Sequence, residues 1–129
     1  MQIHEQTHIV TSNDLDIRAH VNNIRYVTWV QDIAEAHWNS KTSKAIRDQF
    51  YWVMVSHYIQ YKAEAILGDT LSLKTFVIKS EGVRSTRMVE IYNASTNKLL
   101  TTSETIWCFM SHDTHRPARI PKGIAELFD

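Results

Sequence analysis

The chain has 129 residues, 43% of them apolar and 22% charged, which fits one folded domain over residues 1–129 with a core of ordinary size. Its 14 basic and 14 acidic residues cancel, so no overall electrostatic field attracts nucleic acid or an anionic membrane, and we expect neither as a partner. Cys108 is the only cysteine, which excludes an internal disulfide, and because no segment resembles a signal peptide or a membrane span we expect a cytoplasmic protein.

The first part of the chain predicts one strand and one long helix. The strand is expected at Ile3–Val10, and a polar segment then continues to Asn22. Helical periodicity runs from about Asn23 to Asn39. We expect one face of this helix to be buried, because large side chains recur on it at helical spacing: Tyr26, Trp29, Val30, Ile33 and His37.

After a polar connection at residues 40–49, the chain predicts four long strands. The segments are rich in β-branched and aromatic residues and span Phe50–Ala65, Thr70–Ser80, Val83–Asn93 and Leu99–Met110. Short turns separate them at Gly68-Asp69, Glu81-Gly82 and residues 93–97, which predicts that consecutive strands are antiparallel neighbours. With the early strand added at an edge, the sequence predicts an α+β fold in which about five antiparallel strands wrap around the helix.

Residues 14–23, DLDIRAHVNN, combine acids, an imidazole and amides immediately before the predicted helix. Asp14 and Asp16 point the same way if this segment is extended, and Asn22 or Asn23 is well suited to cap the helix. A carboxylate beside the free N–H groups of a helix start is a catalytic arrangement. The alternative is an ordinary polar loop with an N-cap, since Asn and Asp favour turns in any protein.

The longer pattern from Asp14 to Trp29, DLDIRAHVNNIRYVTW, resembles the D-x-D-x-x-x-H-V-N-N-x-x-Y-x-x-W signature of hot-dog-fold acyl thioesterases. The resemblance continues through YKAEAILGDTL (residues 61–71) and RPARIP (116–121), so it covers nearly the whole chain. It implies the hot-dog fold and hydrolysis of an acyl-CoA or acyl-ACP thioester. It also implies a homodimer or a dimer of dimers with active sites at the interface, where the motif segment of one chain faces the strands of the other, so that Asp16 and Glu64 can come from different chains.

The resemblance assigns the chemistry to two carboxylates and one imidazole. Asp16 matches the second Asp of the motif and is expected to act as base or nucleophile. His20 matches the motif histidine, which orients the site or bonds the thioester carbonyl. Glu64, expected within the second strand, matches the acid proposed in plant acyl-ACP thioesterases to attack or to activate water. Outside a catalytic role, these residues would be a solvated or capping acid, a structural histidine and an exposed acid paired with a cross-strand base.

Substrate binding is expected at the helix start and on one strand. N–H groups near Asn22 and Asn23 are placed to bind a developing oxyanion. Arg84 is expected to contribute to a positive rim for the nucleotide of coenzyme A, because phosphates favour the guanidinium fork. Strand alternation puts Arg87 on the opposite face from Arg84.

Two positions depart from the family pattern, and both bear on mechanism. Arg18 stands where the acyl-ACP enzymes carry an Asn, and Ala65 stands where they carry a Cys, so a papain-like mechanism has no thiol at that place. Cys108, between Trp107 and Phe109, is expected to be a buried and inert thiol. No cofactor is required, and no metal is expected because the histidine pairs lack a third ligand. The alternative functions are a hot-dog dehydratase or hydratase and a non-catalytic acyl-thioester-binding domain.

Overall fold

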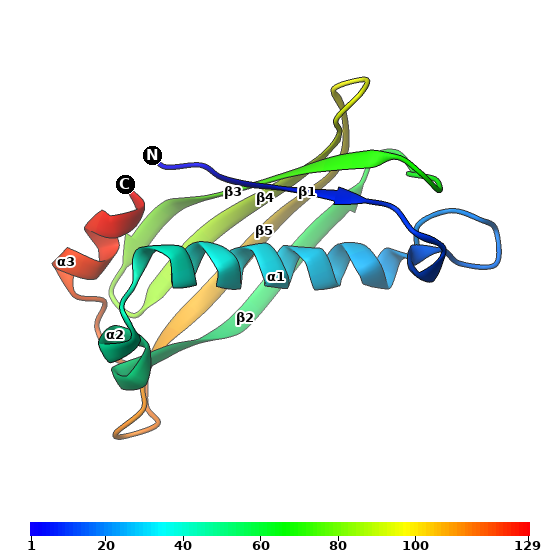
Figure 1. Cartoon of the computed structure of the whole chain (residues 1–129). Coiled ribbons are helices and arrows are strands. Elements are labelled where there is room, and N and C mark those ends of the chain that lie inside the picture. Colours follow the sequence, from blue (N-terminus) through cyan, green and yellow to red (C-terminus); the bar gives the residue numbers. More distant parts are fainter.

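The helix α1 (Asn23–Lys41) lies against one face of a five-stranded antiparallel sheet in the computed structural model, which describes residues 1–129 (Figure 1). The strands are β1 (His4–Ile9), β2 (Phe50–Tyr61), β3 (Thr70–Glu81), β4 (Arg84–Asn93) and β5 (Lys98–Ser111). Their order across the sheet is β1-β3-β4-β5-β2. The expected α+β architecture, one long helix wrapped by about five antiparallel strands, is confirmed.

A side-chain cap and one buried face determine where α1 begins and how it lies. Asn22 is the N-cap, and its Oδ1 accepts a hydrogen bond from the N–H of Ile24 at 3.0 Å. The face expected to be buried is buried, since Val30 and Ile33 are 0% exposed and His37 is 1% exposed. The Asn22 cap therefore determines where the helix begins. The spacing of the apolar residues determines which face of the helix is turned towards the sheet.

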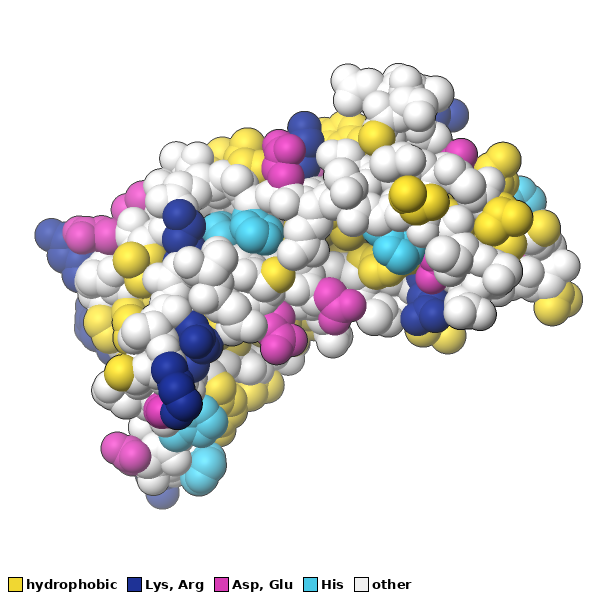
Figure 2. Space-filling model, in the orientation of Figure 1, with side chains coloured by type: hydrophobic (Ala, Val, Ile, Leu, Met, Phe, Trp, Pro, Cys, Tyr) yellow, Lys and Arg dark blue, Asp and Glu magenta, His cyan; other side chains and the backbone are white.

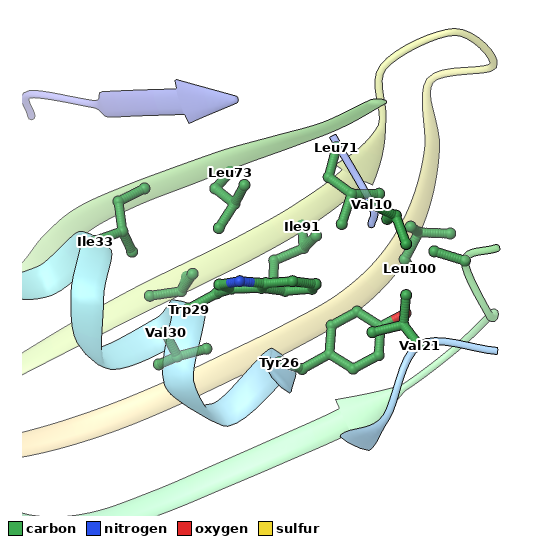
Figure 3. Close-up of a cluster of buried hydrophobic side chains, with 12 residues drawn as sticks. Val10, Val21, Tyr26, Trp29, Val30, Ile33, Leu71, Leu73, Ile91 and Leu100 are labelled. Atoms are coloured by element: carbon green, nitrogen blue, oxygen red, sulfur yellow. The ribbon is translucent and has the colours of Figure 1, made fainter. Parts of the chain in front are cut away.

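The main core fills the space between α1 and the sheet. Figure 3 shows Trp29 and Ile33 of the helix together with Leu71, Leu73 and Ile91 of the strands, all of them members of one buried cluster. Burying a side chain of this size contributes about 1.5–3 kcal/mol each. Several such contacts along one helix face fix the position of α1 on the sheet.

Irregular pairing bends the sheet around α1. The register shifts near residues 54–56 of β2, 77–79 of β3 and 91–92 of β4. A bulge places an extra residue on one strand, which bends that strand and increases its twist. The bulges therefore curve the sheet towards the helix.

The predicted order of the strands is wrong at one place. β2 was expected beside β3, but β2 pairs with β5 at one edge while β3 lies between β1 and β4. The turn at Gly68-Asp69 does not close a hairpin; instead, the Gly68 N–H donates to the carbonyl of Val10 at 3.1 Å. A turn reverses the chain only locally, and residues 62–69 are long enough to cross the ends of two intervening strands.

Short helices cover the far end of α1. The polar connection expected at residues 40–49 contains α2 (Lys44–Gln49), which begins at a Ser43 cap. After β5, the chain forms α3 (Lys122–Ala125) and the turn η2 (Glu126–Phe128). The Phe128 ring meets His37 edge-on at 4.9 Å, and His4 stacks on His37 at 5.1 Å, so both termini meet on the last turns of α1 (Figure 1). None of these helices is both long enough and apolar enough to cross a bilayer.

Candidate active site at the start of α1

The loop before α1 folds back on itself and brings Asp16 to His20. Leu15 and Val21 form an isolated β-bridge. Within this bridge, the Asp16 N–H donates to the His20 carbonyl at 2.8 Å. Ala19 closes the turn in the left-handed region at φ +62°, a conformation that is uncommon for a residue with a side chain. The backbone of the loop therefore fixes the spacing of two motif residues.

A second loop supplies the other carboxylate. Glu64 was predicted within a strand, but β2 ends at Tyr61, and Glu64 lies in the segment that crosses the sheet towards β3. That segment pairs with the motif loop, because the Val21 N–H donates to the Ala65 carbonyl at 3.0 Å and His20 bridges to Ile66. Backbone pairing between the two loops therefore places Glu64 beside His20.

The side chains at this junction form a mixed-charge cluster. Arg18 Nη2 donates to Glu64 Oε1 and lies 3.3 Å from His20 Nδ1. His20 Nε2 lies 3.4 Å from Glu64 Oε2. Asp16 Oδ1 accepts hydrogen bonds from the N–H groups of Arg18 at 2.8 Å and His20 at 3.3 Å, whereas its Oδ2 has no partner in the chain. One oxygen of Asp16 is thus held in place and the other is free to react.

A cavity of about 330 Å³ opens at this cluster. Its lining combines the two carboxylates with the start of the helix: Asp16, Arg18, Val21, Asn22, Asn23 and Glu64. The Asn23 N–H, at the first position of α1, has no hydrogen-bond partner within the chain. Carboxylate oxygens and a free helix-start N–H therefore share one cavity, an arrangement suited to acyl transfer.

The structure brings together five of the six residues expected from the sequence. Asp16, Asn22, Asn23 and Glu64 line the cavity, and His20 contacts Glu64. Within one chain, Asp16 and Glu64 already line the same cavity, because the crossing segment after β2 carries Glu64 to the motif loop.

Arg84 is the expected substrate-binding residue that does not reach this cavity within one chain. It is exposed at the start of β4, in register with Cys108 of β5 and, through it, with Val53 of β2. The cavity lies beyond the other end of β2, so Arg84 is roughly 25 Å away along the strand direction. Arg87 lies on the opposite face, as alternation predicted, and the structure shows that it is buried there.

Asp14, the first acid of the motif, is a structural residue. Asp14 is only 4% exposed. Its Oδ2 accepts a hydrogen bond from His8 Nε2 at 2.8 Å, and Arg25 Nε lies 3.3 Å from its Oδ1. The Thr11 N–H also donates to it at 2.9 Å. The Thr11-Ser12-Asn13-Asp14 spacing is a capping-box pattern, so the sequence contained a signal for this role.

Arg18, which stands where the acyl-ACP enzymes carry an Asn, forms an ion pair with Glu64. The two residues are 46 positions apart. No local pattern predicts such a pair, because it depends on the crossing segment that follows β2. The described residues contain no group of three or more His, Cys, Asp or Glu side chains that could hold a metal ion.

Comparison with known proteins identifies the family. Residues 10–128 match the model of the thioesterase-like superfamily, and the chain belongs to this family. A search of curated proteins gave no match.

Solved structures share the fold over nearly the whole chain. A 1,4-dihydroxy-2-naphthoyl-CoA thioesterase from Synechocystis has 18% identity and a TM-score of 0.85, with 98% of this chain and 96% of that chain covered. A mutant 4-hydroxybenzoyl-CoA thioesterase complexed with 4-hydroxybenzoyl-CoA has 13% identity and a TM-score of 0.89, with 100% of both chains covered. The protein SAV2348 from Staphylococcus aureus, in complex with CoA, has 18% identity and a TM-score of 0.89, with 98% of this chain and 81% of that chain covered. The hot-dog fold is thereby confirmed.

We expect Asp14→Asn to destabilise the protein by about 1–3 kcal/mol at pH 7, because a buried charged acceptor is lost from a hydrogen-bonded pair. Burial raises the pKa of Asp14, but the His8 and Thr11 hydrogen bonds and nearby Arg25 outweigh it, so the net pKa is below the ordinary 3.8. The ionised Asp14 therefore contributes fully to the free energy of unfolding above pH 3.8. This contribution is lost as the pH falls through the lower pKa that Asp14 has in the folded protein.

Denaturant unfolding of both proteins at pH 7 and at lower pH measures this effect, and the stability difference should shrink in acid. Asp32→Asn is the matched control, since Asp32 is exposed on α1 and should change stability by less than about 0.5 kcal/mol. Equal stability of Asp14→Asn and wild type at pH 7 would contradict the structural role.

Proposed function

We propose that this protein hydrolyses an acyl-CoA thioester in the cavity at the start of α1. The observation that supports this proposal is the convergence of Asp16, Glu64 and the free Asn23 N–H on one cavity in a member of the thioesterase-like superfamily. Hydrolysis of a thioester needs a donor for the developing oxyanion and a base or nucleophile, and this lining contains both.

In the proposed reaction, the thioester carbonyl oxygen accepts a hydrogen bond from the Asn23 N–H, aided by the positive end of the α1 dipole. The free Oδ2 of Asp16 either removes a proton from water, which attacks the carbonyl carbon, or attacks that carbon itself and is released by water afterwards. The carbon–sulfur bond breaks, and the thiolate takes up a proton. The products are a carboxylic acid and a free thiol.

Glu64 and Arg18 complete the proposed site. The ion pair with Arg18 offsets one of the two negative charges in the cavity and holds the Glu64 carboxylate in place. Glu64 also contacts His20 Nε2, which orients the imidazole towards the thioester. In this proposal, the charged side chain of Arg18 holds Glu64, at the position where the family pattern has the amide side chain of an Asn.

Coenzyme A is the proposed carrier, with acyl carrier protein as the second choice. Two of the similar structures are named as thioesterases of aromatic acyl-CoA compounds, and a third was solved with CoA. The reaction needs neither a metal nor an organic cofactor. A cytoplasmic setting, expected from the sequence, stays part of this proposal.

Purified protein should release free thiol from at least one member of a panel of aliphatic and aromatic acyl-CoA and acyl-ACP thioesters without added metal or nucleotide. The physical reason is the presence of both an oxyanion donor and a carboxylate in one cavity. A thiol-reactive dye measures the release. Saturable binding of a thioester without release would favour a binding domain, and conversion of an enoyl thioester to its hydroxy form would favour a hydratase.

Replacing Asp16 by Asn keeps the size of the side chain but removes its basicity, and we expect kcat to fall by about 2 to 4 orders of magnitude. Glu64→Gln should also be severely impaired, because the Arg18 pair and the His20 contact are weakened. Cys108→Ala is the control and should keep nearly full activity, since the thiol is buried between strands. Substantial turnover by folded Asp16→Asn protein would refute the assignment.

We further propose that the working unit is a homodimer or a dimer of dimers joined along β2. This strand has 12 residues, is an edge of the sheet and pairs only with β5. Apolar side chains beside the cavity are exposed, among them Ile17, Ile24 and Leu67. An unpaired edge strand and an exposed apolar patch both favour association, and a two-fold axis would cover both.

Antiparallel pairing of two β2 strands would also give Arg84 a role. The start of one β2 would lie beside the end of the other, so the end of the sheet that carries Arg84 would approach the cavity of the second chain. We propose that Arg84 binds the coenzyme A phosphates of the neighbouring site in this way.

Mixing Asp16→Asn with Arg84→Met protein should restore activity at low substrate concentration, because each hybrid dimer regains one intact site. Random exchange makes about half of the dimers hybrids, so about a quarter of the wild-type rate should return. Mixing Asp16→Asn with Glu64→Gln should restore nothing, since both residues lie in the same chain's cavity. A fully active monomer in light scattering at assay concentration would refute the dimer.

A further inference from the structure

A second and larger cavity, of about 400 Å³, lies at the opposite end of α1. It is bounded by the last turns of α1, the start of β2, and the α3 and η2 segment (Figure 1). Its walls are aromatic and include Trp38, Phe50, Trp52, Trp107 and Phe128. It shares no lining residue with the cavity at the start of α1. None of the residues assigned to the proposed hydrolysis lines this cavity.

A buried guanidinium lies in this apolar cavity. Arg87 lines it, comes from the helix-facing side of β4 and is 7% exposed. Its Nη1 donates to His37 Nδ1 at 2.8 Å and to Thr75 Oγ1 at 3.0 Å. Its Nε and Nη2 have no hydrogen-bond partner in the chain, and Arg87 belongs to none of the protein's salt bridges. One complete edge of the guanidinium thus has no partner among the protein's own atoms.

The groups that face Arg87 do not neutralise its charge. Burial lowers the pKa of Arg87 to about 10, so the guanidinium is charged at neutral pH. Burial, followed by the charges of Arg87, His4 and Lys41, lowers the pKa of His37 to about 4, so His37 is a neutral acceptor. Glu35 is the only acid that lines the cavity, and it is exposed at the rim.

The surroundings of the cavity are basic as well. Arg47 of α2 also lines it, and Figure 2 shows Lys and Arg side chains gathered over α2 and the neighbouring end of α1. A buried cation without a counter-ion is unfavourable in a folded protein, and anions bound in such sites relieve that cost. Local charge therefore favours an anionic occupant, while the aromatic walls favour an apolar one.

We propose that this cavity is a binding site for an apolar carboxylic acid, whose carboxylate pairs with the free Nε–Nη2 edge of Arg87 and whose hydrocarbon or aromatic body lies between the tryptophan and phenylalanine walls. The two N–H groups on that edge are parallel and match the two oxygens of a carboxylate. The aromatic walls contribute the apolar contact typical of small-molecule pockets. This site does not depend on the thioester hydrolysis proposed above.

The test compares 4-phenylbutyrate with its neutral isostere 4-phenylbutanamide by titration calorimetry on the full chain. We expect the acid to bind wild type at least about tenfold more tightly than the amide, the ratio that one charged hydrogen-bonded pair supports. Trp38, Trp52 and Trp107 line the cavity, so tryptophan emission should report the same binding. Equal affinities for the acid and the amide, or no binding of either at millimolar concentration, would overturn the proposal.

Variants then locate the binding site. Arg87→Met should reduce the affinity for 4-phenylbutyrate to about that for the amide and leave the amide affinity nearly unchanged. Arg116→Met is the matched control, because Arg116 is exposed and lines neither cavity, and it should leave both affinities unchanged. A preference for the acid that survives in Arg87→Met would overturn the assignment. If Arg87→Met does not fold, Arg87→Lys replaces it, because lysine keeps the charge but loses the parallel pair of N–H groups, and an unchanged preference for the acid in that variant would overturn the assignment.

Discussion

The burial of one face of α1 against a curved sheet is the interaction on which the rest of the structure depends. Val30 and Ile33, near the middle of the helix, are fully buried, and the strands bend around them at their bulges. The two cavities described above lie on either side of this buried contact, one at the first turn of the helix and one towards its last turns.

The two ends of α1 differ in charge in the way that the helix dipole favours. The first turn carries the positive end of the dipole and faces the carboxylates of Asp16 and Glu64. The last turns carry the negative end and lie near Lys41 and the buried Arg87. The same helix therefore supports an acidic site where an oxyanion could form and a basic site where a carboxylate could bind. Neither arrangement requires a change in the core.

Much of the fold could be predicted from local patterns. The buried face of α1 follows from apolar residues at helical spacing, and the hairpins β3–β4 and β4–β5 follow from short turns between β-rich segments. The motif also predicted that Asp16, His20 and Glu64 act together, and the structure places them in one cluster. The fold predictions succeeded because each depends on residues that are close in sequence, and the three site residues were found together because they belong to one family pattern.

The sequence by itself thus determined the helix, the strands and the residues of the candidate site. Only the tertiary structure decided that β2 pairs with β5 rather than with β3. It also decided that Glu64 lies beside the motif loop of its own chain and that Arg87 is buried without a counter-ion. The partner of a strand and the burial of a charge depend on contacts between segments that are far apart in the sequence. Each such contact is favourable only when the rest of the fold has formed. Local periodicity and turn chemistry carry no information about that choice.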